Sequence, residues 1–124
     1  VDVSRDGNLL ACAGDDGVVR VLRRTAIGWE SHATLTGHQS GVFDVAFGPN
    51  RLLASGARSG VVMIWDLDTK SEIGRYEMLD GMVFAVDFDG EDLIAAGADA
   101  MLRRLRMSTA DERISRNRPP TPEW

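Results

Sequence analysis

The side chains that could carry out chemistry are few and widely spaced in this sequence. It has two histidines, His32 and His38, and one cysteine, Cys12. A hydrolytic site needs a nucleophile, a base and an orienting group in one place. A structural zinc site needs a full set of nitrogen and sulfur ligands. Residues so few and so scattered favour neither chemistry, so we predict no catalytic residue and no metal ligand.

An acidic cluster is the second candidate for chemistry. Its members are Asp87, Asp89, Glu91 and Asp92. They suggest calcium, but the alternating loop ligands and the distal Glu of a helix-loop-helix site are missing. We interpret the cluster as a solvated hairpin turn. The glycines of the chain lie between apolar runs rather than ahead of a helix, which argues against a phosphate-binding loop. We therefore predict no cofactor and no enzymatic activity.

The elements that must hold these residues repeat along the chain. Residues 9–21 recur 43 positions later as residues 52–64. A third copy follows 41 positions on, where residues 83–88 echo residues 42–47. A period in the low forties fits a four-stranded propeller blade, and it also overlaps the longer helical repeats.

Strand periodicity distinguishes between these two architectures. The apolar runs are short and rich in Val, Ile and Phe, and every second residue of 45–47 and 86–88 is large and apolar. That is the period of a strand with one buried face. Turn residues such as 15–17 and 48–50 separate the runs. We therefore predict an all-β chain, with strands near residues 1–4, 8–13, 18–23, 32–36, 42–47, 52–56, 61–66, 72–78, 83–88, 92–96 and 101–106.

The middle copy resembles the WD-repeat family of β-propellers. It has the Gly37-His38 pair, the inner run 42–47 and the closing Trp65-Asp66 pair, at the separation typical of the family. Partial copies on both sides extend the resemblance over about residues 1–106. It implies a β-propeller arc of about three four-stranded antiparallel blades, part of a larger propeller. We predict that the arc occupies residues 1–107, with repeats near 1–36, 37–78 and 79–107.

The resemblance also implies a polar network inside each blade. In the family, a His, a strand Ser or Thr, a turn Asp and the Trp are joined by hydrogen bonds. The residues that match this structural motif here are Gly37, His38, Ser55, Trp65 and Asp66. Ser59 stands at the turn in place of Asp, and the outer copies have Leu22-Arg23 and Leu105-Arg106 in place of Trp-Asp. We therefore expect a weaker network than is usual in the family.

Blades of this family present side chains around one end of the central channel. One such position follows the first Val of each opening strand, and both visible copies have Phe there. Two interpretations of these rings stay open, packing between blades and exposure at the rim. Exposed rings beside charged residues would favour a binding hot spot over an active site. The candidate partner-binding rim consists of Phe43, Phe84, Arg58, Asp15, Gln39 and Met82.

The composition is that of an ordinary globular protein. Hydrophobic residues make up 44% of the chain and charged residues 27%, with a net charge of −5. We find neither an apolar run of bilayer-spanning length nor an amino-terminal secretion signal. These features predict a cytoplasmic protein without a membrane partner. Because Val1 falls inside a strand, we interpret the chain as a fragment. Its missing blades would come from a longer chain or from self-association.

Basic residues gather toward the carboxyl end. All of them except Lys70 are arginines, and residues 103–106 precede a stretch rich in Arg, Ser, Thr and Pro. We predict that residues 108–124 form a flexible Arg/Pro-rich tail. A basic patch can meet phosphate. However, Arg103 matches Arg20 as an outward strand residue, so nucleic-acid binding is not our preferred interpretation.

The function that the resemblance implies is that of a rigid, non-catalytic scaffold. It would mediate protein–protein interaction within a complex. The alternative is a regulatory or substrate-recruiting propeller appended to an upstream catalytic domain, such as a signalling enzyme. A propeller enzyme with a metal or quinone in its channel is disfavoured by the shortage of His and of inward-facing carboxylates. The fold alone identifies no partner.

Overall fold

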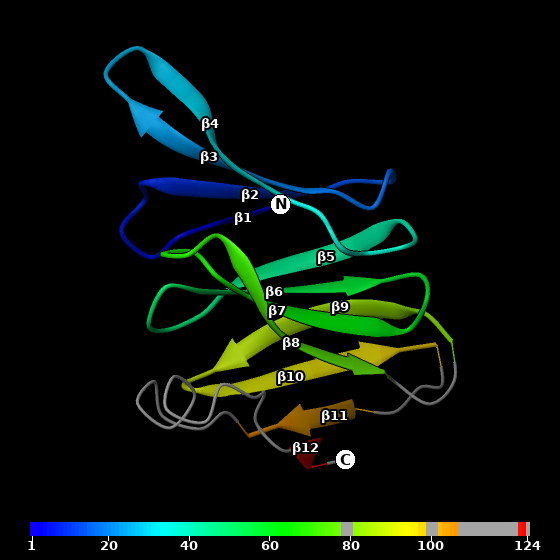
Figure 1. Cartoon of the computed structure of the whole chain (residues 1–124). Coiled ribbons are helices and arrows are strands. Elements are labelled where there is room, and N and C mark those ends of the chain that lie inside the picture. The colour runs from blue at the N-terminus through cyan, green and yellow to red at the C-terminus, as the bar shows by residue number, and fades with distance from the viewer. Residues whose placement is uncertain (78–80, 99–101, 107–121, 124) are drawn as a thin grey trace.

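The computed structural model describes residues 1–77, 81–98, 102–106 and 122–123. The described chain forms three antiparallel sheets stacked one on the next (Figure 1). The first sheet contains β1 (Asp2–Val3), β2 (Leu9–Ala13), β3 (Val19–Thr25) and β4 (Gly28–Leu35). The second contains β5 (Val42–Phe47), β6 (Leu52–Ala57), β7 (Val61–Asp66) and β8 (Ser71–Glu77). The third contains β9 (Val83–Asp89), β10 (Asp92–Gly97), β11 (Leu102–Leu105) and β12 (Pro122–Glu123). Across these residues, no helix has the length and apolarity needed to cross a membrane.

The same turn joins the second and third strands of the first two sheets. Gly17 N donates to Gly14 O and Gly60 N donates to Ala57 O, each at 3.1 Å. Gly17 and Gly60 have φ values of 84° and 90°. Glycine adopts this left-handed conformation without steric cost, and the conformation turns the chain back into a hairpin. The repeat in the sequence therefore corresponds to a repeat in backbone geometry.

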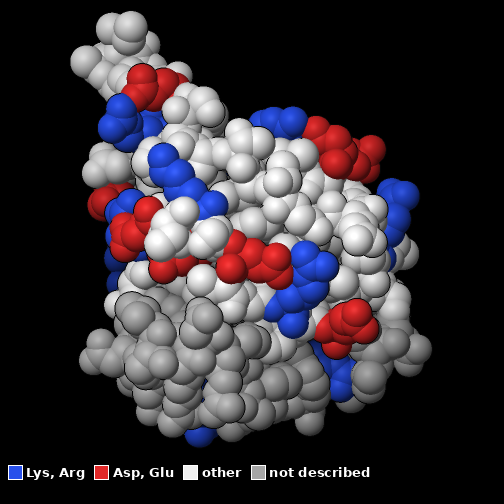
Figure 2. Space-filling view, in the orientation of Figure 1, with Lys and Arg blue, Asp and Glu red and all other residues white. Residues whose placement is uncertain are grey.

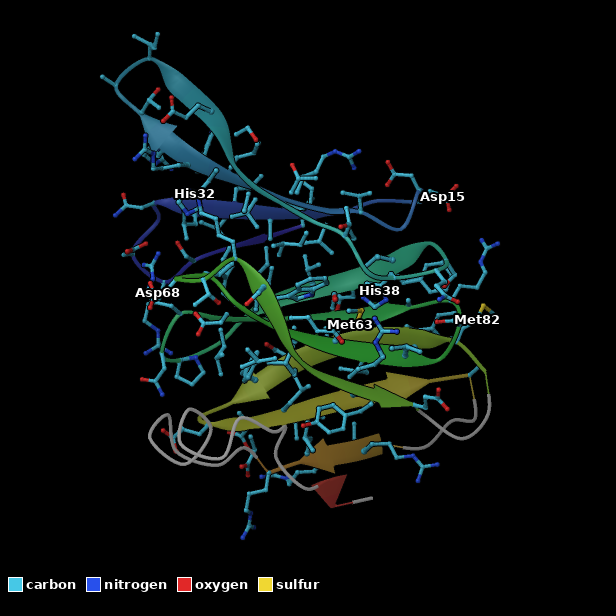
Figure 3. The ribbon with its side chains drawn as sticks, viewed as in Figure 1. Asp15, His32, His38, Met63, Asp68 and Met82 are labelled. Carbon is cyan, nitrogen blue, oxygen red and sulfur yellow. The ribbon has the colours of Figure 1, made fainter. Side chains whose placement is uncertain are left out.

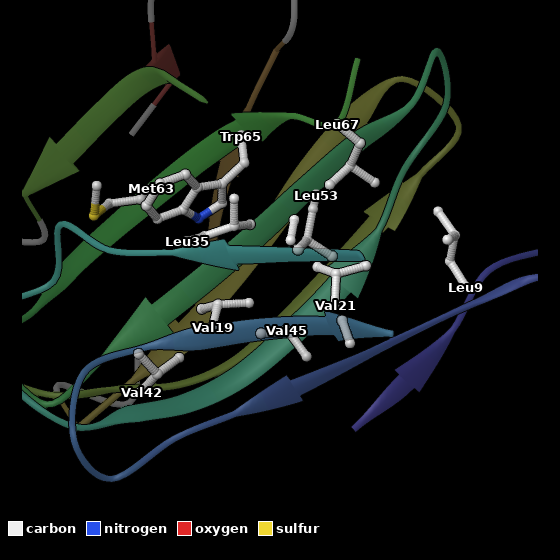
Figure 4. Packing of buried hydrophobic residues seen from close by; sticks show 12 residues of the cluster. Leu9, Val19, Val21, Leu35, Val42, Val45, Leu53, Met63, Trp65 and Leu67 are labelled. Carbon is white, nitrogen blue, oxygen red and sulfur yellow. The ribbon is translucent and has the colours of Figure 1, made fainter. Parts of the chain in front are cut away.

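The middle sheet is covered on both faces. All residues of β6 are buried, and successive residues of a strand point to opposite faces of its sheet. One face packs on the first sheet through a cluster that includes Leu53, Met63 and Trp65 (Figure 4). The other face packs on the third sheet through Leu52, Ala54, Val62 and Ile64. The apolar stacking of the three sheets is the core of the structure.

Polar contacts between the first strands of the sheets add to this packing. Asp2 Oδ2 accepts a hydrogen bond from Phe47 N, and Asp44 Oδ2 accepts one from Val86 N, both at 2.9 Å. Strand β5 therefore lies between β1 and β9 and is bonded to both through carboxylates. We call β1, β5 and β9 the inner strands.

The predicted all-β architecture of three stacked sheets is confirmed, with two differences in its elements. Strand β4 begins at Gly28 instead of near residue 32, so the β3–β4 hairpin is longer than predicted. Residues Pro122–Glu123 pair with β11 as a fourth strand that the sequence did not indicate. The other residues of the predicted flexible tail, 108–121 and 124, lie outside the described residues. The tail and the repeat boundaries stay predictions.

Candidate functional site

Phe43 and Phe84 lie side by side at one end of the stack. Their ring centroids are 5.7 Å apart and their planes are inclined by 33°. Phe43 is 38% exposed and Phe84 is 52% exposed, whereas Val42 and Val83 immediately before them are 5% and 0% exposed. The valines fill the spaces between sheets and the rings point outward. Of the two interpretations that the sequence left open, the structure has the exposed one.

Two charged residues flank this aromatic pair. The Arg58 guanidinium carbon is 5.7 Å from the centroid of the Phe43 ring, within the range of a cation–π contact. Arg58 N donates to Gly41 O at 2.9 Å, which holds the β6–β7 turn against the start of β5. Asp15 also lies against Gly41, where a Cβ would be 2.8 Å from Asp15 Oδ1. A cation and an anion therefore lie close to the segment that leads into Phe43.

The two remaining candidates are near this group without a described contact to the rings. Gln39 is exposed and helps to line a hollow of about 510 Å³ beside His38 and Ser59. Met82 is half-buried, and its carbonyl oxygen accepts a hydrogen bond from Ala98 N at 2.8 Å. Figure 3 shows Met82 at the same end of the stack as Asp15. We define the rim patch as Phe43, Phe84, Arg58 and Asp15.

A polar network is buried inside the middle sheet. The Trp65 Nε1–H donates to Ser55 Oγ at 2.9 Å, and this oxygen lies 2.6 Å from His38 Nε2. Ser55 is 0% exposed. Its hydroxyl accepts from the indole and retains a proton to share with the imidazole. The network joins the chain ahead of β5 to strands β6 and β7.

Gly37 and Asp66 support this network from outside it. Gly37 has a φ of 156°, and a Cβ on it would lie 2.8 Å from Met63 Cε, so a larger residue here would strain the backbone and displace the methionine side chain. Asp66 Oδ1 accepts a hydrogen bond from Asp68 N at 2.9 Å. Asp66 therefore closes the turn after β7 and does not bond to the histidine.

The environment of His38 keeps its imidazole neutral. Burial, and to a smaller extent the nearby Arg75 cation, lower the pKa of His38 to about 4. Its Nδ1 atom is buried and has no hydrogen-bond partner within the described residues. Ser59 occupies the turn position where the family has Asp. His38 is thus a structural residue of the sheet, and one of its nitrogens lacks its expected partner.

The first sheet has the turn carboxylate but uses it differently. Asp16 Oδ2 accepts from Arg20 Nη2 at 2.7 Å, and Asp16 Oδ1 accepts from Val18 N at 3.1 Å. These bonds, that with Arg20 first, lower the pKa of Asp16 to about 2. Asp16 therefore stabilises its own hairpin. The corresponding residue of the third copy, Asp99, lies outside the described residues.

The acidic cluster forms a hairpin, as predicted. Asp89 and Asp92 face each other where β9 meets β10. Arg104 bonds to both, with its Nη2 3.1 Å from Asp89 Oδ2. No group of three or more His, Cys, Asp or Glu side chains in the described ranges is arranged to hold a metal ion. Two of the four carboxylates of the cluster, Asp89 and Asp92, thus share one guanidinium from the neighbouring strand.

Asp44 and Asp2 are positions that sequence reasoning missed. Both lie on inner strands and accept backbone hydrogen bonds from the next sheet. The only available signal was a carboxylate inside a short strand that is otherwise mostly apolar. Strand periodicity does not say which neighbouring backbone such a side chain would reach.

Three antiparallel sheets that stack through their apolar faces, with inner strands side by side, define an arc of a β-propeller. The family model "WD domain, G-beta repeat" matches residues 1–22 and 29–66. The buried His38–Ser55–Trp65 network lies within the second of these matches. The chain belongs to the WD-repeat family.

Individual proteins show the same relationship. The chain is 31% identical over 108 residues to "Protein hir1" of Aspergillus terreus (strain NIH 2624 / FGSC A1156). The match covers 80% of this chain but 10% of that relative. Solved structures of U3-55K and of the RRP9 WD40 repeats each superpose with a TM-score of 0.76 at 23% identity. Each covers 85% of this chain, which spans 32% of either structure. At this identity, the two structures show a shared fold.

Proposed function

We propose that this chain is a non-catalytic scaffold that binds another protein through its rim patch. The observation that carries the proposal is the pair of exposed rings, Phe43 and Phe84, which lie 5.7 Å apart, with the Arg58 guanidinium over the Phe43 ring. The rings come from two adjacent blades. Aromatic residues and arginine are the residue types that dominate the energetics of protein interfaces.

The backbone around the patch favours binding at low entropic cost. Each ring follows a buried valine of an inner strand, and the Arg58 turn is bonded to Gly41. A partner would therefore immobilise few groups that are not already held in place, which lowers the entropic cost of association. Arg58 supplies a positive charge over the Phe43 ring and Asp15 supplies a negative charge beside Gly41, and such charges fix the orientation of a partner.

We propose a non-catalytic function because the residues that could take part in catalysis already have structural contacts. His38 is buried, its pKa is lowered and its Nε2 is engaged with Ser55. At the β9–β10 turn, Asp89 and Asp92 are engaged with Arg104. The rim patch itself holds two phenylalanines and a flanking ion of each sign, a composition suited to recognition.

The test is affinity purification of the tagged chain from cells of its source, with quantitative mass spectrometry. In the Phe43→Ser and Phe84→Ser double variant, the recovery of at least one specific partner should fall by about tenfold or more. Val3→Ser is the matched control, because Val3 is a 46% exposed apolar residue of an inner strand away from the patch. Thermal denaturation of both variants shows that they are folded. Equal partner recovery by the double variant and the wild type would overturn the proposal.

A further inference from the structure

The β3–β4 hairpin projects from the body of the molecule. Figure 1 shows it extending past the ends of β1 and β2, and Figure 2 shows the same projection in outline. The repeat aligns Arg23 with Asp66, where β7 ends, but β3 continues to Thr25. The hairpin is therefore an extension that the equivalent strands of the middle blade lack.

The tip of this hairpin has an unexpected composition. The two residues between the strands are Ala26 and Ile27. Hairpin tips favour Gly, Asn, Asp, Pro or Ser, because these residues suit turn geometry. Ile27 is instead a β-branched apolar residue that is 99% exposed, and Trp29 beside it is 39% exposed. Neither turn geometry nor the core explains an isoleucine here.

Hydrogen bonds hold the tip in a defined shape. The Thr25 Oγ1–H donates to Gly28 O at 3.1 Å, and Thr25 Oγ1 accepts from Ile27 N at 3.3 Å. An ion pair between Arg23 and Glu30 joins the two strands below the tip. The exposed isoleucine therefore stands on a rigid support.

Arg24 fixes the hairpin to the body. Its backbone N donates to Asn8 O at 2.8 Å, and its Nε donates to Gly7 O at 2.9 Å. The same guanidinium carbon lies 4.6 Å from the centroid of the Trp29 ring. One side chain thus connects the turn between β1 and β2 to the tryptophan and sets the direction of the hairpin.

We propose that the β3–β4 hairpin is a docking element that inserts Ile27, with Trp29 at its side, into an apolar pocket of a partner protein. A convex, pre-shaped projection fits a concave partner and is immobilised at little entropic cost. Its arms carry two guanidinium groups, of Arg23 and Arg24, against the single carboxylate of Glu30. This charge balance fits a pocket with an electronegative rim.

The contact between Trp29 and Arg24 argues against a lipid surface as the occupant. The tryptophan is stacked under Arg24 and is not free to enter a bilayer. A single aliphatic side chain provides little area for membrane insertion.

Photocrosslinking of the full chain tests this assignment. The probe is p-benzoylphenylalanine in place of Ile27, and the matched control has it in place of Lys70, an exposed residue at the β7–β8 turn. The position-27 probe should form an adduct with one protein that the position-70 probe does not capture. The captured protein is then purified and titrated against wild type, Ile27→Ser and Lys70→Ser. Ile27→Ser should raise the Kd at least about tenfold, and Lys70→Ser should leave it unchanged.

The rim variants separate this proposal from the proposed function. The Phe43→Ser and Phe84→Ser double variant should keep its affinity for the captured protein. An adduct with a phospholipid or with a second copy of the chain would overturn the docking assignment. So would the absence of any specific adduct, or wild-type affinity in Ile27→Ser. Because the Ile27 side chain is almost fully exposed, Ile27→Ser should melt at the wild-type temperature.

Discussion

Asp44 of the second blade accepts a hydrogen bond from the backbone nitrogen of Val86 in the third blade, at 2.9 Å. Its carboxylate supplies an acceptor to β9, which is the edge strand of its sheet and has no further strand beside it there. Asp2 provides the same bond for Phe47 in the second blade. Adjacent blades are thus connected by backbone-directed carboxylates as well as by apolar packing.

Removing the Asp44 carboxylate should loosen the contact between the second and third blades. We expect Asp44→Ala to lower the free energy of unfolding by about 1 to 2 kcal/mol, because Val86 N loses its acceptor in a half-buried place. Asp44→Asn should cost less, since the amide oxygen can still accept. Urea denaturation measures both. Glu91→Ala, at an exposed turn, is the control. If it lowers the free energy of unfolding as much as Asp44→Ala does, the hydrogen bond between the blades does not contribute as we expect.

The Ser55 hydroxyl should be the most sensitive polar group of the middle blade. Ser55→Ala leaves the Trp65 indole N–H and His38 Nε2 without their common partner. Each unsatisfied buried group costs about 1 to 3 kcal/mol, so for the two groups we expect a loss of about 2 to 6 kcal/mol in the free energy of unfolding. Ser71→Ala, at an exposed position, should change it by less than about 0.5 kcal/mol. Similar values for the two variants in chemical denaturation would refute this ranking.

Stability should fall in acid because His38 must take up a proton on unfolding. The pKa of folded His38 is about 4, against an ordinary value of 6.5. The unfolded chain therefore binds more protons than the native chain between these values, and stability rises with pH there. The contribution of His38 is complete above the ordinary pKa and is lost as the pH falls toward the folded one. Urea denaturation at several pH values checks this in a background that carries His32→Gln. Between pH 6.5 and about 4, the free energy of unfolding should fall less in the protein that also carries His38→Gln than in the one that keeps His38.

A carboxylate at position 59 should satisfy the unpartnered nitrogen of His38. We expect Ser59→Asp to raise the pKa of His38 and to increase the free energy of unfolding by about 1 kcal/mol. The reason is that Ser59 lines the same hollow as the imidazole and occupies the turn position of the family's Asp. NMR titration of the imidazole gives the pKa. Ser59→Asn is the uncharged control, and an unchanged pKa in Ser59→Asp would show that the carboxylate does not reach the ring.

Substitution of two neighbouring residues of β9 should lower the stability to very different extents. Val83 is fully buried between blades, so Val83→Ala should lower the free energy of unfolding by about 2 kcal/mol. Phe84 is 52% exposed, so Phe84→Ser, which removes mainly the ring contact with Phe43, should lower it by about 1 kcal/mol or less. Thermal denaturation of the two variants checks the contrast. A larger loss in Phe84→Ser would mean that the ring packs between blades.

Strand periodicity and turn residues were enough to predict most of the sheet architecture. Strand β7 and the turn before it were predicted within a residue, because apolar alternation and the glycine turn both indicate them. The start of β4 was missed because residues 28–31 are exposed on both faces and have no apolar alternation. Strand β12 was missed because its neighbours in sequence have the composition of a tail.

The candidate site was less predictable because it depends on how blades meet. The sequence placed Phe43 and Phe84 one residue after a buried valine, but their exposure depends on where the next sheet ends. The bond from Val86 N to Asp44 likewise depends on the register between two sheets, which no pattern within one strand specifies. Sequence reasoning did anticipate the incomplete network, because Ser59 replaces the turn Asp.

The two rim phenylalanines belong to different blades, so any ligand that covers both also spans the seam between them. Such a ligand would stabilise the contact between the two blades, and its binding would raise the temperature at which the second and third blades separate. Linkage works in both directions. Substitutions deep in that seam, such as those at Asp44 or Val83, would weaken ligand binding without touching the ligand.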